Sequence, residues 1–197
     1  MPQPPTAPPV DPQGTTPFAE RVAAKIEAAQ ASVPSMVVLV WGPGETVGDP
    51  WWEKRLDIRN ALREAGHEAY FSEELPGGLP TQGDARQIAL RNAEFIQANE
   101  ADYIIVLMSS VGAVSEFHDF GDKPHLAKKM LVFMDETHQA GYSASLLGQF
   151  EAAHGKVELV KVPDDLVECN VLGRSLERIQ GIRDLKLHEA LEGGTYE

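Results

Sequence analysis

Two kinds of apolar pattern alternate along the chain. Runs rich in apolar and β-favouring residues predict strands near residues 35–42, 67–75, 101–108, 129–135 and 156–162. Between them, apolar residues recur every three or four positions, which predicts helices near 17–29 and 50–65, from 84 onward, and near 142–153 and 172–191. Strands that alternate with amphipathic helices are typical of βαβ units and of a parallel sheet with helices on both faces.

This order of elements predicts an α/β fold. We expect a three-layer, Rossmann-like (flavodoxin-like) sandwich with a five-stranded, mostly parallel sheet. One such domain is expected to cover residues 17–197, behind a disordered, proline-rich tail over residues 1–16. The sequence shows no internal repeat and no sign of a second domain.

The segments that follow the predicted strands carry most of the candidate chemistry. Right-handed crossovers bring the carboxyl ends of parallel strands to one edge of the sheet, where ligands of such folds bind. The segments expected there are "WGPGE" (41–45), "SEEL" (72–75), "SSVGAVSEFHDFG" (109–121) and "DETHQAGY" (135–142).

Glycines follow the first predicted strand, as they do in dinucleotide-binding proteins. A regular fingerprint would need a third glycine where Val47 stands, and no Walker loop is present. Two interpretations stay open, a turn that contacts a sugar or phosphate and a plain strand-to-helix turn. Under the first, the candidate contacts are Trp41, Gly42, Pro43 and Gly44.

Charged residues near the same edge are candidates for holding a ligand. The guanidinium of Arg55, on the helix after the first strand, has a fork of donors suited to a phosphate or carboxylate. Glu73, at the end of the second strand, could accept hydrogen bonds from ribose hydroxyls. The alternative for both residues is a solvated surface position.

The third edge segment contains an acidic candidate for catalysis. Its small residues Ser109, Ser110 and Gly112 would let a ligand approach the backbone. Glu116 is expected in the first turn of the next helix, where the helix dipole favours an ionised carboxylate. A capping box would need Ser or Thr at position 113, which is Ala113, so a functional role for Glu116 is favoured over a structural one.

Two neighbours of Glu116 are assigned supporting roles. His118 or Asp119 could orient Glu116. A metal site is not expected, because spacings of two and three residues do not place three ligands on one helix face.

Overall composition narrows the classes of partner. A formal net charge of -13 argues against binding nucleic acid or an anionic membrane. The single cysteine, Cys169, excludes an internal disulfide and favours a reducing cytoplasm. No run approaches the roughly 20 apolar residues of a membrane span, and we expect no signal peptide.

Three stretches together resemble a known family. "ADYIIVLMSSVGAVSEFHDFG" (101–121), "KKMLVFMDE" (128–136) and "KRLDIRNALREAGHEAYFSEEL" (54–75) resemble the nucleoside 2-deoxyribosyltransferase-like proteins. These are relatives of the TIR and SLOG Rossmann-like domains of bacterial antiphage and nucleotide-signalling systems. The resemblance spans about residues 36–135, and the family's Asp-rich loop before the catalytic helix is replaced by "SSVGAV".

The resemblance implies a function. Glu116 would be the catalytic glutamate that attacks or stabilises the anomeric carbon when an N-glycosidic bond breaks. His118 or Asp119 would assist the leaving base or orient Glu116. The substrate would be a nucleoside, a nucleotide or NAD, with no cofactor or metal required, and the protein would act as an antiphage effector, as a homo-oligomer or with a partner defence protein. The alternatives are a non-catalytic, SLOG-like nucleotide sensor and a scaffold that assembles through Trp51, Trp52 and the C-terminal helix.

Overall fold

The structure is a computed structural model that describes residues 17–74, 84–138 and 142–192. For residues 84–89, 111, 112, 116, 138 and 142–145 it describes the backbone alone. The predicted tail, 1–16, lies outside the described residues. The chain divides into two units, Met1–Pro34 with Arg183–Glu197, and Ser35–Ile182. The domain predicted over 17–197 therefore includes the whole second unit and parts of the first.

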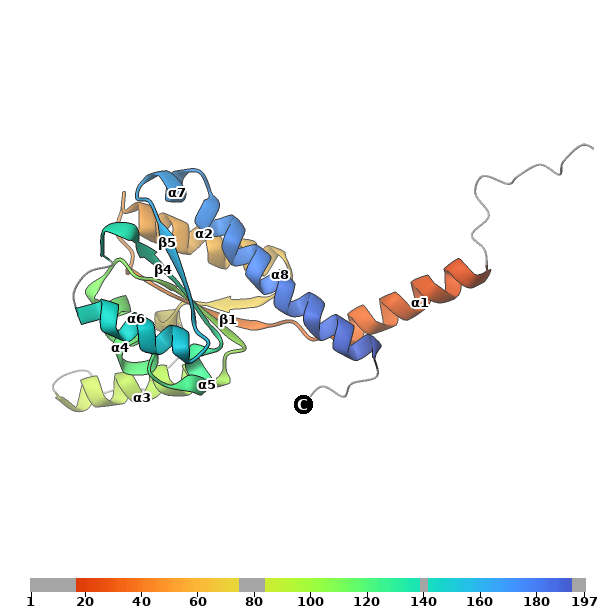
Figure 1. Ribbon diagram of the computed structural model, residues 1–197, viewed down its shortest axis with the longest axis horizontal. Helices are drawn as coiled ribbons and strands as arrows, with labels where there is room; N and C mark the ends of the chain where they lie inside the picture. The colour runs from red at the N-terminus through yellow and green to blue at the C-terminus, as the bar shows by residue number, and fades with distance from the viewer. Residues whose placement is uncertain (1–16, 75–83, 139–141, 193–197) are drawn as a thin grey trace, which may run out of the picture. The chain divides into compact units, whose positions relative to one another are not determined.

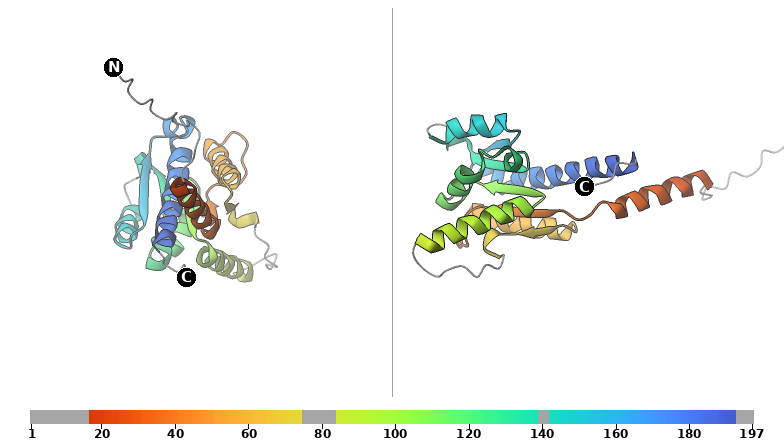
Figure 2. Two further views of the ribbon diagram at one scale, coloured as in Figure 1. Left: turned by 90° about the vertical axis from the view of Figure 1, so that its right-hand side faces the viewer. Right: turned by 90° about the horizontal axis from the view of Figure 1, so that it is seen from below.

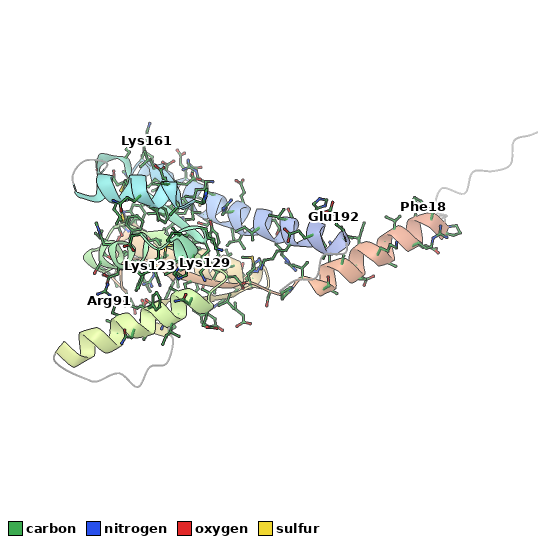
Figure 3. All side chains as sticks on the ribbon, turned by 60° about the horizontal axis from the view of Figure 1, so that its bottom comes forward. Phe18, Arg91, Lys123, Lys129, Lys161 and Glu192 are labelled. Atoms are coloured by element: carbon green, nitrogen blue, oxygen red, sulfur yellow. The ribbon has the colours of Figure 1, made fainter. Side chains whose placement is uncertain are left out.

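In the first unit, the predicted N-terminal helix forms as α1 (Pro17–Ser32). Its apolar stripe is exposed: Phe18 is 68% exposed, Val22 39% and Ile26 43%. Figure 3 labels Phe18 near the start of this helix.

The second unit contains a five-stranded sheet in which every neighbouring pair of strands is parallel. The strand order β2-β1-β3-β4-β5 confirms the predicted Rossmann-like, flavodoxin-like sandwich. The strands are β1 (Val37–Trp41), β2 (Glu68–Tyr70), β3 (Tyr103–Leu107), β4 (Met130–Asp135) and β5 (Lys156–Val160).

Helices cover both faces of this sheet (Figure 1, Figure 2). Alternation along β1 sends Val38 and Val40 into the core on one face, and Leu39 and Trp41 into the core on the other. The first face is covered by α2 (Pro50–Glu64), α7 (Asp164–Val167) and the part of α8 (Asn170–Leu191) that lies in this unit. The second face is covered by α3 (Asp84–Glu100), α4 (Val111–Phe120), α5 (Pro124–Ala127) and α6 (Tyr142–Ala152).

The helix that follows β1 has clear stop and start signals. The Asp49 carboxylate caps α2 by accepting a hydrogen bond of 2.9 Å from the Trp51 amide, and Pro50 occupies the first turn. Gly66 follows the helix with a φ of +86°, a conformation that glycine adopts at little cost. These two ends confirm the helix predicted near residues 50–65.

The second strand is shorter than predicted. The prediction of strand over 67–75 is wrong in its second half, because residues Ser72–Glu74 form the 3-10 helix η1. The Phe71 amide donates 2.9 Å to the Glu74 carboxylate of η1. This amide is therefore not available for a hydrogen bond to a neighbouring strand, and β2 ends. Another 3-10 helix, η2 (Glu136–His138), follows β4. Within the described ranges, no helix is long and apolar enough to cross a membrane.

Candidate functional site

A cleft of about 790 Å³ opens where β1 and β2 end. The turn after β1 contributes Gly42, Gly44 and Glu45, and the segment from Phe71 to Glu74 borders the other side. A face of α2 forms the wall between them, with Trp52 and Arg55 among its residues. The cleft therefore lies at the carboxyl edge of the sheet, as the order of elements predicts.

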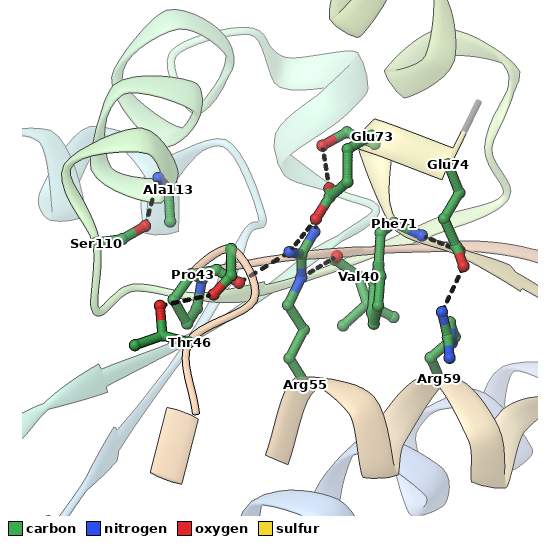
Figure 4. A network of polar contacts seen from close by, with 12 residues as sticks. Val40, Pro43, Thr46, Arg55, Arg59, Phe71, Glu73, Glu74, Ser110 and Ala113 are labelled. Carbon is green, nitrogen blue, oxygen red and sulfur yellow. Dashed lines mark hydrogen bonds and ion pairs between the residues drawn. The ribbon is translucent and has the colours of Figure 1, made fainter. Parts of the chain in front are cut away.

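Arg55 is the central polar residue of this cleft, although it is only 1% exposed (Figure 4). Its Nε donates 2.9 Å to the carbonyl of Val40, and its Nη1 donates 2.9 Å to the carbonyl of Pro43. Nη1 and Nη2 also donate to the two carboxylate oxygens of Glu73, at 2.6 and 2.8 Å. Arg55 thus joins the end of β1, the turn after it and η1.

The guanidinium of Arg55 has a partner within the protein. The residue lines the cleft, and its fork of donors, predicted to suit a phosphate or carboxylate, holds the carboxylate of Glu73. A bidentate pair of this kind has high directional specificity, because both partners are planar. Pro43 contributes its carbonyl to Arg55 and is not among the lining residues.

Glu73 keeps one side open to the cleft. Its side chain is 52% exposed, although both of its oxygens accept from Arg55. Partial burial raises the pKa of Glu73, but the hydrogen bonds and charge of Arg55 outweigh burial and hold the pKa below its ordinary value. Oε2 of Glu73 also accepts 3.2 Å from the Ser72 hydroxyl. A fixed carboxylate that is half exposed can still accept hydrogen bonds from a ligand, as predicted for ribose hydroxyls.

A second acid–base cluster continues the same wall. One oxygen of Glu74 pairs with Arg59, and the other accepts from Arg63 at 3.2 Å. The Phe71 ring lies against the guanidinium groups of Arg55 and Arg59. Its centroid is 4.1 Å from the guanidinium carbon of Arg55 and 4.3 Å from that of Arg59. We did not predict the aromatic lining of the cleft from the sequence. A signal was present, because Trp52, Arg55 and Arg59 stand three and four residues apart on one helix face.

The residues of the turn after β1 have different roles. A Cβ atom on Gly42 would lie 3.2 Å from both Arg55 Cδ and Leu107 Cβ, so this glycine allows the turn to pack against β3. A Cβ on Gly44 would have no described atom within 4 Å, and Gly44 lines the cleft. Trp41, which was predicted to contact the ligand, is not a lining residue of the cleft. Its side chain is fully buried, 5.6 Å from the Phe120 ring between centroids.

The segment after β3 begins its helix earlier than predicted. Ser110 caps α4, since its Oγ accepts 3.2 Å from the Ala113 amide, and the helix starts at Val111. Glu116 is therefore the sixth helical residue, and the prediction that it lies in the first turn is wrong. The effect of the helix dipole fades within the first turn, so it gives no argument for an ionised Glu116.

The structure leaves the side chain of Glu116 undescribed. For Gly112 and Glu116 the structure describes only the backbone, which is part of α4. Ser109 is exposed between β3 and α4. Because Trp41 pairs with Val106, the turns after β1 and β3 leave the sheet next to each other. Among the candidates after β3 whose side chains the structure describes, Ser109, Ser110, His118 and Asp119, none lines the cleft.

His118 and Asp119 also lie away from the cleft lining. Asp119 pairs with Arg91 of α3 at 2.9 Å, and its carbonyl accepts 2.6 Å from the Lys123 ammonium; Figure 3 labels both cations. The His118 ring lies 6.0 Å from the ring of Phe117. In the part of the chain that the structure describes, no three metal-ligating side chains are grouped as an ion would need.

Comparisons with known proteins find fold-level likeness alone. No family model matches the chain, and no curated protein matches it either. A conserved protein from Enterococcus faecalis V583 is 13% identical, with a TM-score of 0.49 over 74% of this chain and 99% of that one. An azoreductase from Bacillus anthracis str. Sterne is 13% identical, with a TM-score of 0.40 over 76% and 99%. The fold class rests on the chain's own parallel sheet and strand order.

Proposed function

We propose that the protein cleaves or transfers the N-glycosidic bond of a nucleoside, nucleotide or NAD-like molecule whose sugar lies in the cleft beside β1 and β2. One observation carries the proposal: the Glu73 carboxylate is fixed by two hydrogen bonds from Arg55 and is still 52% exposed. The same contacts hold the pKa of Glu73 below its ordinary value, which favours the ionised form. A fixed carboxylate suits sugar hydroxyls, which need an acceptor of defined direction. Trp52, which also lines the cleft, offers an aromatic surface to a base.

The reaction we propose proceeds at the anomeric carbon. The base leaves with the electron pair of the C–N bond and takes up a proton. Water or a second base then bonds to the same carbon and gives up one proton to the solvent, so no net proton is consumed. The sugar develops oxocarbenium character, which a nearby carboxylate stabilises. We assign that carboxylate to Glu116, on the family resemblance and on the position of α4 next to the turn that borders the cleft.

The setting of the activity is part of the proposal. We propose a cytoplasmic antiphage effector that works as a homo-oligomer or with a partner defence protein, and that needs no cofactor or metal. The resemblance supports the defence role, and the presence of one cysteine in the whole sequence supports a reducing compartment.

Release of free base tests the proposal. The protein is incubated with NAD and with a panel of nucleosides and nucleotides, and the products are separated by chromatography. We expect one substrate to lose its base, the Glu116→Gln variant to lose this activity, and the Glu151→Gln variant, changed at an exposed position of α6, to keep it.

The other outcomes are equally specific. Release that continues undiminished in Glu116→Gln removes the role assigned to that residue. Binding of a panel member without any turnover makes the protein a nucleotide sensor instead of an enzyme.

A further inference from the structure

The charges that line the cleft are unequal. Among its described lining residues, two arginines, Arg55 and Arg59, stand against three glutamates, Glu45, Glu73 and Glu74, which leaves one negative charge in excess. We infer that the cleft selects an unphosphorylated nucleoside and rejects the corresponding 5′-nucleotide. This inference rests on the proposed function, because it specifies the substrate of the same cleft.

The first argument is that the best phosphate ligand is already occupied. A guanidinium binds phosphate through a fork of paired N–H donors. In Arg55 that fork points at Glu73, at 2.6 and 2.8 Å, and the Arg55 side chain is only 2% exposed. A phosphate would have to displace Glu73 and enter a buried position, while Glu73 would lose its counter-charge.

The second arginine is occupied in the same way. Arg59 pairs with Glu74, and its Nε and Nη2 donate to the Asn60 side chain at 3.3 and 3.1 Å. Its side chain is 15% exposed, and Glu74 also accepts from Arg63. Both arginines among the described lining residues therefore have a carboxylate partner.

The third argument concerns the helix after β1. In many nucleotide-binding α/β folds, free amides at this helix N-terminus bind a phosphate. Here the carboxylate of Asp49 accepts 2.9 Å from the Trp51 amide, and Pro50 has no N–H to offer. Asp49, Pro50 and Trp51 are not among the cleft's lining residues, and a carboxylate of the protein occupies this anion site next to the cleft wall.

These three arrangements predict a penalty for a 5′-phosphate. A phosphate monoester carries close to two negative charges at neutral pH. It would meet an excess negative charge without a free cation among the described lining residues. At a separation of several ångströms in a wet cleft, repulsion of this kind corresponds to a weakening of roughly tenfold.

Matched pairs of ligands test the inference. Calorimetric titration of the full-length protein at low salt uses adenosine, guanosine, cytidine and uridine, each beside its 5′-monophosphate. For every nucleoside that binds, we expect the monophosphate to bind about tenfold more weakly, and the difference to shrink in high salt because the charges are screened.

A charge reversal at an exposed residue of the lining identifies the cause. Glu45→Lys should close the gap between nucleoside and nucleotide, whereas Glu177→Lys, an exposed position on α8, should leave it unchanged. Monophosphates that bind as tightly as nucleosides, or a gap that survives Glu45→Lys, overturn the specificity and leave the cleft's proposed function standing. If none of the eight compounds binds, the inferred specificity for nucleosides is overturned, and the base-release assay with NAD decides whether the proposed function stands.

Discussion

The pairing of Arg55 with Glu73 gives a measurable contribution to stability. The test changes Arg55→Met and Glu73→Gln, singly and together, and compares the four free energies of unfolding. Methionine keeps much of the length of the side chain and its contact with the Phe71 ring, so the change removes mainly the charge and the donors.

The expected size follows from the contacts. Arg55→Met strands the carbonyls of Val40 and Pro43 as well as the Glu73 carboxylate, and breaking a fully buried pair costs about 3–5 kcal/mol. Glu73 is 52% exposed, so water compensates part of the loss and the lower end, about 3 kcal/mol, is expected. The coupling energy between the two changes should be about 1.5–2 kcal/mol.

Urea unfolding at pH 7 measures the four values. The matched control is the pair Arg91 and Asp119, which is bonded at 2.9 Å but has side chains 60% and 32% exposed, and its coupling should stay below about 0.5 kcal/mol. A coupling for Arg55 and Glu73 no larger than that of the control pair would refute the structural role assigned to Arg55.

The same cycle has a defined dependence on pH. Because the folded protein holds the pKa of Glu73 below its ordinary value of 4.5, the stabilisation is complete above that value. It is lost as the pH falls through the lowered, folded-state pKa. In a pH series the coupling should therefore stay constant from pH 7 to about 5 and decline at lower pH.

Three further changes test separate parts of the structure. Gly42→Ala should cost about 1–3 kcal/mol, because the added Cβ meets two side chains at 3.2 Å, whereas Gly44→Ala, in open space, should change the unfolding free energy by less than about 0.5 kcal/mol. Ser110→Ala should lower the unfolding free energy by about 1 kcal/mol through loss of the α4 cap. Burial and a nearby carboxylate raise the pKa of Glu94, so its ionisation destabilises the fold as the pH rises through the ordinary value to the raised one. Glu94→Gln should therefore raise the thermal midpoint at pH 7 and leave it unchanged below pH 4; an equal gain at both would contradict this origin.

The fold was predictable because its signals are local. Buried parallel strands are continuously apolar, as in Val37–Trp41 and Tyr103–Leu107, and each is followed by a helix with recognisable ends. Alternation along β1 also places Trp41 on the same face as Leu39, which would have assigned it to the core and not to the ligand.

The location of the candidate site was predictable from the sequence, but the contacts within it were not. The carboxyl edge follows from the topology, whereas the partner of Arg55 depends on a contact between residues 18 positions apart. A guanidinium that can hold a phosphate can hold a protein carboxylate equally well, and sequence alone does not distinguish them. The start of α4 was misplaced because the small residues after β3 were interpreted as a loop. Ser110 instead caps a helix that already includes Gly112 and Ala113, which puts Glu116 beyond the first turn.

The central claim is that a nucleoside binds with its sugar against Glu73, in the cleft beside β1 and β2. Hydrogen–deuterium exchange of the backbone amides, with and without each of the four ribonucleosides at saturating concentration, tests it most directly. A bound nucleoside should slow exchange in the segments 42–45 and 71–74, which border the cleft. Unchanged exchange in both segments with every nucleoside, or protection confined to other parts of the chain, would contradict the claim.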